Sequence, residues 1–388
     1  MRVLIIGAGV AGLAAAVALR RDGHEVTVAE QAPALRTSGA AVTLWSNGSG
    51  ILADLGVSLD GAGAPIDTLE QWAADGRRLI TADVARAARA HGHPHVCLPR
   101  RRLLERLAGA LPEGVVEFGR DCTGVTGAGD TVRASFAGGA TAEADLVVGA
   151  DGRRSAVRGG LWDRDPAEPS GWGSWQGLTP VPIDVTSSRR GLMIVGRGGS
   201  VGLMPAGEGL LQWWFDMPWN PREPAPASPL AEIRRRFGDW CPPVPDVLEA
   251  AREEDVEFFP HYRHRVPRTW GTGRVTLAGD SAHSMPPARA QGANQALEDA
   301  WTLAAVLRGA PDADVPTALR AYERRRARKA GIVARHSATE DVNKYRPLLS
   351  RLIPDALAGV YYTRWLARIS DFLGPEPART APHPKRAG

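Results

Sequence analysis

A glycine-rich turn near the start of the chain has the spacing of a nucleotide-binding loop. Gly7, Gly9 and Gly12 follow a short apolar run and precede an alanine-rich stretch that predicts a helix. In such a turn the first glycine makes the bend, the second admits a pyrophosphate, and the third lets helix and strand pack closely. Glu30 follows the next apolar run, where an acid can bond the ribose hydroxyls of an ADP group. Residues 2–30 therefore predict a dinucleotide-binding βαβ unit.

A second chemically rich stretch lies near Asp280. Gly279 and Asp280 end an expected strand, Pro286 and Pro287 restrict the loop that follows, and a helix is expected from Gly292. A helix N-terminus has unpaired N–H groups and partial positive charge. A carboxylate, prolines and a helix start in this order suit an electron-rich or anionic ligand.

Taken together, these stretches resemble the single-component aromatic hydroxylases, the FAD-dependent class A monooxygenases. The resemblance implies that Asp280 bonds the ribityl chain of FAD and that Pro287 lies beside the isoalloxazine ring. The helix that begins at Gly292, Ala293 and Asn294 would then direct its N-terminus at the pyrimidine end of that ring. The glycine turn alone fits FAD or NAD, and the distant Gly-Asp motif favours FAD through the resemblance.

The resemblance extends over roughly residues 1–330 and is greatest to short members such as salicylate hydroxylase-like and tetracycline-inactivating monooxygenases. Arg100 matches a family segment in which an arginine reaches the flavin pyrophosphate. Arg101 or Arg102 would take that role if the register differs by one or two residues.

Asp151 stands in an Asp-Gly pair that matches the family's DG motif, which is linked to both FAD and NAD(P)H binding. We expect Asp151 to be mainly architectural, because an aspartate in this position can cap a helix. Arg154 and Arg158 behind it are candidate contacts for a nicotinamide phosphate.

Catalytic side chains are not identified by the sequence, because the resemblance implies that the flavin carries the chemistry. Pro287 and Arg289 are the nearest candidates, Arg289 through a guanidinium aimed at a substrate phenolate or carboxylate. A solvent-facing Arg289 is the alternative. We expect His283 to belong to the loop framework. Ala290 replaces the family's usual glycine, and its methyl group is expected to constrain the loop or the cavity beside the flavin.

Residues 165–265 are rich in tryptophan and proline and predict a sheet laid over the flavin, with strands at 191–195, 200–204 and 210–215. Along the last strand, Gln212 and Trp214 point to one face. These two residues, Met204 and Trp175 are the candidate substrate contacts, because aromatic side chains suit an aromatic or polycyclic ligand. Core filling is the alternative for any single tryptophan.

The expected fold is α/β, a Rossmann-like FAD-binding domain interleaved with a β-sheet substrate domain and followed by C-terminal helices. We expect the following division: FAD-binding domain, 1–65, 98–164 and 266–330; substrate domain, 66–97 and 165–265; C-terminal helical segment, 331–373; flexible tail, 374–388.

Bulk composition narrows the function classes. The 388 residues are 44% hydrophobic and 23% charged with a net charge of +4, as in ordinary globular proteins. Arginine runs lie in helical contexts, so solvated helix faces are favoured over nucleic-acid binding. The sequence contains no stretch of about 18 consecutive apolar residues, so no membrane span is predicted. His91, His93 and His95 alternate, but no cysteine or acid completes a set, and we expect a polar loop without a metal.

Three cysteines without CxxC spacing suit a reducing compartment, and no signal peptide is expected, so the cytoplasm is the expected location. The expected reaction uses NADPH or NADH and O₂. The resemblance implies that a flavin C4a-hydroperoxide hydroxylates or epoxidises an aromatic or polycyclic small molecule. The alternatives are another FAD oxidoreductase, an oxidase or reductase, and a non-catalytic flavin-fold binding protein. A monomer or homodimer is expected.

Overall fold

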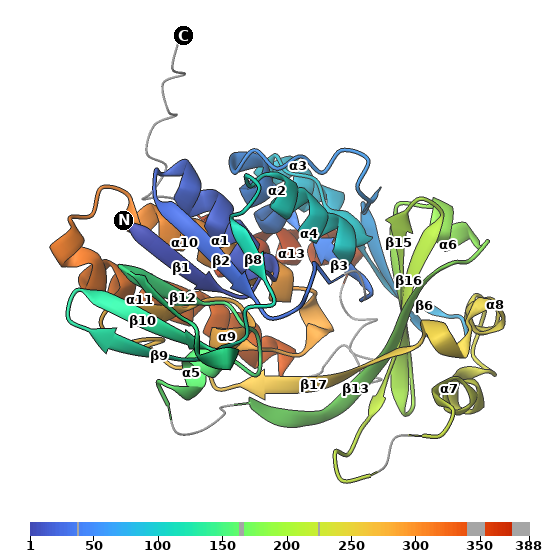
Figure 1. Cartoon of the computed structure of the whole chain (residues 1–388). Coiled ribbons are helices and arrows are strands. Elements are labelled where there is room, and N and C mark those ends of the chain that lie inside the picture. The colour runs from blue at the N-terminus through green and yellow to red at the C-terminus, as the bar shows by residue number, and fades with distance from the viewer. Residues whose placement is uncertain (37–38, 163–166, 224–225, 340–353, 375–388) are drawn as a thin grey trace.

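The computed structural model of the chain places two sheet-based layers side by side (Figure 1). The residues that it describes are 1–36, 39–162, 167–223, 226–339 and 354–374. The predicted tail lies outside these residues except for Gly374. No helix among these residues is both long and apolar enough to cross a membrane.

The first layer is a five-stranded sheet in which all neighbouring strands are parallel. Residues 3–6, 146–148 and 275–277 of this sheet are buried and mostly apolar, as expected for parallel strands that are covered on both faces. In spatial order they are β18 (Val275–Leu277), β12 (Leu146–Gly149), β1 (Arg2–Ile6), β2 (Glu25–Glu30) and β8 (Val116–Phe118). Helices α1 (Val10–Arg21) and α10 (Gly292–Leu307) pack together and share the core of this layer.

Two small antiparallel sheets complete this layer. One contains β9 (Cys122–Ala128), β10 (Thr131–Phe136) and β11 (Thr141–Ala144), and the other contains β3 (Ala41–Leu44), β7 (Val96–Pro99) and β4 (Ala64–Pro65). Strand β7 runs across the domain boundary predicted after residue 97. The helices beside these strands are α2 (Ser46–Asp54), α4 (Arg100–Gly109), α5 (Ala156–Gly159) and α9 (Asp280–His283).

The second layer is a seven-stranded sheet drawn from two distant parts of the chain (Figure 1). In spatial order its strands are β17 (Glu257–His264), β13 (Ala167–Pro180), β16 (Leu210–Pro218), β15 (Gly199–Gly207), β14 (Arg190–Gly196), β5 (Thr68–Ala73) and β6 (Arg78–Asp83). One face packs on the short helices α6 (Asp184–Ser187), α7 (Pro229–Phe237) and α8 (Val244–Ala250) around a core that contains Trp213 and Phe215. The opposite face packs toward the first layer.

Two C-terminal helices join the layers. Helix α11 (Val315–Ser337) packs on α10, and α13 (Asp355–Ile369) packs on β6, on α11 and on the short helix α3 (Ala85–His91). The Ala-, Arg- and His-rich sequence of 66–97 predicts strands and a loop, but residues 85–91 form helix α3 instead. Its Ala-Arg repeat has high helix propensity, and Gly92 ends the helix in the left-handed conformation (φ 75°).

We predict that Trp213→Ala lowers the free energy of unfolding by about 3–5 kcal/mol, the usual cost of removing a buried aromatic side chain. Trp213 is fully buried and its Nε1–H donates to Thr179 Oγ1 at 2.9 Å. Chemical denaturation measures the loss. Phe259→Ala is the control, because Phe259 is 39% exposed, and an equal loss there would contradict the assignment of this core.

Candidate active site

The carboxyl ends of the central parallel strands meet at one edge of the five-stranded sheet. Backbone hydrogen bonds continue the ladder past the strands: Gly7 N–H to Ala29 O at 2.7 Å, Ala150 N–H to Ile6 O at 2.8 Å, and Ala278 N–H to Gly149 O at 2.9 Å. The glycine turn, Asp151 and Asp280 come next in the chain and are therefore brought together. Ligands of open α/β sheets bind at this edge.

The three glycines of the first turn lie in three different environments. Gly7 has a φ of +104°, and a Cβ there would meet Ala150 O at 2.5 Å. A Cβ on Gly12 would overlap the carbonyl oxygen of Gly7, so only glycine lets α1 approach the turn. A Cβ on Gly9 would meet nothing within 4 Å, and Gly9 begins α1 without a side-chain cap. Open space beside an uncapped helix N-terminus fits a pyrophosphate.

Glu30 lies at the end of β2 with its carboxylate against the glycine turn. Its Oε2 accepts a hydrogen bond from Ala8 N–H at 2.7 Å, and its Oε1 accepts from Ala32 N–H at 2.9 Å. Each carboxylate oxygen has a further lone pair. The position therefore fits the ribose hydroxyl groups of an ADP moiety.

The Gly-Asp loop enters the same edge from β18. Gly279 has a φ of 64°, and a Cβ there would lie 2.8 Å from Ala11 Cβ, so the loop passes directly over α1. Asp280 and Pro287 are exposed. Helix α10 begins at Gly292 without a side-chain cap, and a Cβ on Gly292 would meet nothing within 4 Å. An exposed carboxylate beside an uncapped helix start fits the polar groups of a flavin.

The side-chain amide of Asn294 uses both its oxygen and its nitrogen in hydrogen bonds within the protein. Its Oδ1 accepts from Trp45 N–H at 2.9 Å, and its Nδ2 donates to Thr43 O at 2.9 Å and to Ala290 O at 2.8 Å. A Cβ on Gly48 would overlap Asn294 Oδ1, so α2 also fits closely here. The side chain fixes α10 against β3, and only the backbone N–H of Asn294 is left to face a ligand.

Asp151 caps α5, since its Oδ2 accepts from Ala156 N–H at 2.7 Å and from Val157 N–H at 3.2 Å. The suggestion that Arg158 contacts a nicotinamide phosphate is wrong. Arg158 is 3% exposed, and its guanidinium donates to Ser281 O at 2.9 Å and to a second backbone carbonyl. Spacing alone does not distinguish such a buried arginine from the exposed Arg154.

Among the three arginines that begin α4, Arg102 forms ion pairs with Glu208 at 2.9 Å and Glu105 at 3.7 Å. Arg100 is exposed, and its Cδ would lie 3.5 Å from a Cβ on Gly39. Arg100 is therefore better placed than Arg102 to reach a ligand above the loop after β2.

The sheet face toward the first layer carries three of the four predicted substrate contacts. Met204 lies directly opposite Gln212, and Trp214 follows on the same face two residues along β16. The prediction that groups Trp175 with them is wrong. Trp175 is paired with Phe215 on the opposite face and packs on Phe258, with ring centroids 4.4 Å apart. Strand register decides the face, and register depends on long-range pairing.

One apolar cluster joins this sheet face to the loop before α10. It contains Met204 and Met285, with the partly buried Trp214, Ala290 and Tyr362 packed against it. Ala290 has a φ of 47°, a left-handed conformation that favours glycine, and its methyl group lies in the wall of this region. Large apolar side chains therefore line the contact between sheet and loop.

Trp45, His95 and Tyr362 also lie beside this cluster. Of these three, the sequence marked only His95, as one of the alternating histidines. Trp45 follows β3, His95 precedes β7, and Tyr362 belongs to α13. Within the described part of the chain, no group of three or more His, Cys, Asp or Glu residues could hold a metal.

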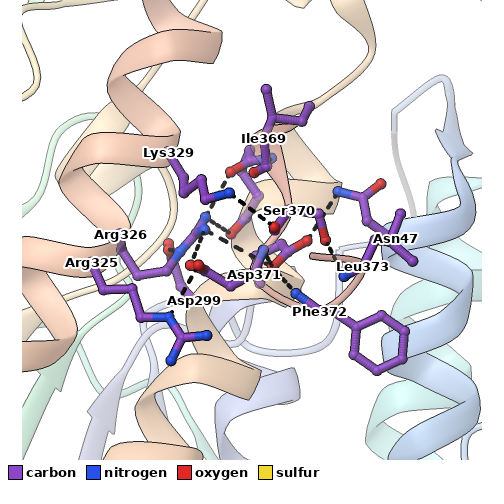
Figure 2. Close-up of polar contacts among 12 residues, drawn as sticks. Asn47, Asp299, Arg325, Arg326, Lys329, Ile369, Ser370, Asp371, Phe372 and Leu373 are labelled. Carbon is purple, nitrogen blue, oxygen red and sulfur yellow. Dashed lines mark hydrogen bonds and ion pairs between the residues drawn. The ribbon is translucent and has the colours of Figure 1, made fainter. Parts of the chain in front are cut away.

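Behind the Gly-Asp loop lies a buried ionic network (Figure 2). Asp299 of α10 accepts from Gly279 N–H at 2.7 Å and from His283 at 2.6 Å through Oδ2, and from Arg326 Nε at 2.7 Å through Oδ1. Burial alone would raise the pKa of Asp299, but the charges of His283 and Arg326 lower it below its usual value. His283 is fully buried, in agreement with its expected framework role.

The same network reaches the segment after α13. Arg326 Nη1 lies 3.2 Å from Asp371 Oδ2, and Glu298 Oε2 accepts from the N–H groups of Asp371 at 2.9 Å and Phe372 at 3.2 Å. Figure 2 shows these groups converging from α10, α11 and the C-terminal segment. No local sequence pattern indicated this network, because its members are paired only by the fold.

Comparison with known proteins identifies the family. Residues 1–337 match the family described as FAD binding domain. The chain is 35% identical over 345 residues to 3-amino-4-hydroxybenzoate 2-monooxygenase of Streptomyces cremeus, with 87% of this chain and 86% of the relative covered. The chain belongs to the FAD-dependent monooxygenases. The predicted fold class, FAD cofactor and monooxygenase activity are confirmed.

Other members agree with this assignment. The FAD-dependent urate hydroxylase of Klebsiella pneumoniae subsp. pneumoniae is 31% identical over 339 residues, with 84% of this monooxygenase and 86% of the relative covered. The crystal structure of Klebsiella pneumoniae HpxO complexed with FAD and uric acid matches with a TM-score of 0.87 at 27% identity, covering 95% and 97% of the two chains. The tetracycline destructase Tet(51), at 20% identity and a TM-score of 0.69, shares the fold.

We predict that Gly9→Val abolishes FAD binding and leaves the fold intact, because a side chain there fills open space above the helix start. Flavin absorbance after reconstitution and the circular dichroism spectrum measure the two properties. Gly12→Val is the matched variant and should lose the fold itself, because its side chain meets the backbone of the turn. Full FAD binding by Gly9→Val would place the pyrophosphate elsewhere.

We predict that Asp299→Asn lowers the free energy of unfolding by about 3–5 kcal/mol, the usual cost of leaving a buried charge without its partner. Arg326 and Asp299 are both fully buried. Glu143→Gln breaks the half-exposed pair with Arg133 and should cost less than about 1 kcal/mol. Urea unfolding of both variants measures the difference, and equal losses would show that the buried network is dispensable.

Proposed function

We propose that this monooxygenase uses NADH or NADPH and O₂ to hydroxylate or epoxidise an aromatic small molecule bound between the seven-stranded sheet and the loop before α10. One observation carries the proposal. The sheet face with Met204 and Trp214 and the loop residues Met285 and Ala290 belong to a single apolar cluster. An aromatic ring held there would lie beside Pro287, on the flavin side of the loop.

FAD would be held at the carboxyl edge of the five-stranded sheet. In this proposal Gly7, Gly9 and Gly12 admit the pyrophosphate, Glu30 binds the ribose, and the remaining contacts come from Arg100, Asp151, Asp280, Pro287, Gly292, Ala293 and Asn294. Their environments support these roles, with Asp151 acting through the α5 cap and Asn294 through its backbone. When bound, FAD supplies the redox and oxygen-transfer chemistry.

The side chains of the chain itself orient the substrate and exclude water. The N-terminus of α10 presents partial positive charge toward the edge where the flavin would lie. The apolar side chains of Met204, Trp214 and Met285 would exclude water from the substrate, which suppresses side reactions with water. Gln212 is a polar group directly opposite Met204 on this sheet face, and Cys97 Sγ donates to its Oε1 at 3.6 Å.

The position of Arg289 is evidence that the substrate is an anionic aromatic compound. It is half-buried in the 3₁₀ turn η3 (Pro287–Arg289), and its charge acts on Tyr362 across the enclosed region. A guanidinium binds carboxylates and phenolates through paired hydrogen bonds. Relatives of this chain are named for 3-amino-4-hydroxybenzoate and 6-hydroxynicotinate, which carry such groups. We therefore propose an aromatic or N-heteroaromatic acid as the substrate class.

A reducing compartment, the cytoplasm, is the proposed location, and it is supported by the cysteines. Cys97, Cys122 and Cys241 are all free thiols. Burial raises the pKa of the Cys97 thiol to about 12, which keeps it protonated and unreactive. A monomer or homodimer is the proposed assembly.

The experiment is an absorbance spectrum of the purified protein, followed by NADH and NADPH consumption under air with a panel of aromatic acids. Flavin bands, consumption accelerated by one acid and a product heavier by one oxygen atom would support the proposal. Hydrogen peroxide without an oxygenated product would indicate an oxidase. A colourless protein that FAD does not reconstitute would indicate a non-catalytic binding protein and overturn the proposal.

We predict that Arg289→Gln raises the KM for the preferred aromatic acid by about 10-fold to 100-fold, since a hydrogen bond to a charged group is worth about 1.5–3 kcal/mol. The Kd for the neutral amide of the same acid should be unchanged. Arg289→Lys should recover part of the loss. Equal effects on acid and amide would show that Arg289 shapes the loop without binding the anion.

A further inference from the structure

Three aromatic rings from separate parts of the chain pack edge to face in the wall of the substrate region. The ring centroids are 5.1 Å apart for Trp45 and His95, 5.4 Å for Trp45 and Tyr362, and 6.0 Å for His95 and Tyr362. Among the residues that the structure describes, each ring carries one buried polar atom without a hydrogen-bond partner: Trp45 Nε1, His95 Nδ1 and Tyr362 Oη. The ring contacts place the three side chains in one cluster.

Unpartnered polar atoms of this kind are costly. Leaving one buried donor or acceptor without a partner costs about 1–3 kcal/mol, and Trp45 and His95 are only 3% and 1% exposed. Three such atoms on mutually contacting rings therefore indicate a partner that the described residues do not supply.

Hydrogen bonding fixes what His95 offers to that partner. Both contacts of Ser46 Oγ are satisfied when it donates to His93 O at 3.0 Å and accepts from His95 Nε2–H at 2.8 Å. The Nδ1 atom then carries a lone pair and is an acceptor. Burial, with a smaller contribution from the charge of His91, lowers the pKa of His95 to about 4, so the neutral ring persists at neutral pH.

The other two rings offer donors. Trp45 Nε1–H can only donate, and the Tyr362 hydroxyl can donate or accept. Burial raises the pKa of Tyr362 well above its usual value, with the charge of Arg289 opposing that shift, so the hydroxyl keeps its proton. One acceptor beside two donors is complementary to a hydroxyl group, which donates one hydrogen bond and accepts others.

The position of the three rings connects them with the substrate region. Trp45 belongs to the apolar cluster of Met204 and Met285, and Tyr362 is packed against that cluster from α13. Trp45 N–H donates to Asn294 Oδ1, so the indole also adjoins the N-terminus of α10. A ring bound beside that helix start can present a substituent to the three polar atoms.

We propose that Trp45, His95 and Tyr362 form a subsite of the substrate cavity that binds a hydroxyl group carried by the aromatic ring of the substrate. The proposal rests on the proposed function, and it adds a substituent and the residues that select it. His95 accepts from the hydroxyl, and Tyr362 and Trp45 donate to it. Arg289 is left for the anionic group of the same ring.

The test uses the FAD-loaded enzyme and two ligand pairs, 4-hydroxybenzoate with benzoate and 6-hydroxynicotinate with nicotinate. The Kd of each acid is measured by equilibrium dialysis and by its effect on the flavin absorbance bands. The wild-type enzyme should bind the hydroxylated member of at least one pair about ten times more tightly. Tyr362→Phe should remove most of that preference without changing the flavin content.

Matched variants separate recognition from packing. Tyr361→Phe makes the same chemical change on the adjacent residue, which is 63% exposed, and should keep the full preference. Trp45→Phe removes a different donor while keeping an aromatic ring, and should also reduce the preference. It serves as the second probe if Tyr362→Phe does not fold.

The proposal is overturned if Tyr362→Phe and Trp45→Phe both keep the wild-type preference. It is also overturned if a flavin-loaded wild-type enzyme distinguishes neither pair, since the three atoms would then hold a trapped water only. Failure of the proposed function has a different signature, because a protein that does not bind FAD shows no flavin bands before any acid is added.

Discussion

The buried carboxylate of Asp299 is the interaction on which the rest of the site depends. Its two oxygens bind the Gly279 backbone, His283 and Arg326, which belong to the Gly-Asp loop and to α11. Asp299 itself lies in α10, whose first turn is the helix start expected to face the flavin. One fully desolvated charge therefore sets the separation between the loop that carries Asp280 and the helix that follows it.

This constraint extends to the wall of the substrate region. Arg326 and Glu298 hold Asp371 and its neighbour just after α13, the helix that carries Tyr362. Asn47 Nδ2 donates to Glu298 Oε1 at 3.3 Å and adds α2, which begins next to Trp45. The Gly-Asp loop, the start of α2 and the segment after α13 are thus held by one buried network, which suits chemistry that depends on orientation and the exclusion of water.

Local patterns in the sequence were sufficient for features whose causes are local. Gly7 has the positive φ that the turn requires, Gly12 needs its small size against the carbonyl group of Gly7, and the alternation of Gln212 and Trp214 follows from the period of a single strand. The pairing of distant segments decides the sheet face of Trp175, the burial of Arg158 and the ion pairs of Asp299. Strand register, burial and ion pairing are properties of the folded chain, so local patterns do not reveal them. Tyr362 was unremarkable in sequence for the same reason.

The most direct test of this account is a crystal structure of the FAD-loaded protein. The account predicts the pyrophosphate over Gly9, the ribose at Glu30, and the isoalloxazine ring between Pro287 and the first turn of α10, with Asp299 still bound to Gly279 and Arg326. A flavin bound away from the carboxyl edge of the five-stranded sheet, or a Gly-Asp loop that leaves Asp299 when FAD binds, would contradict it.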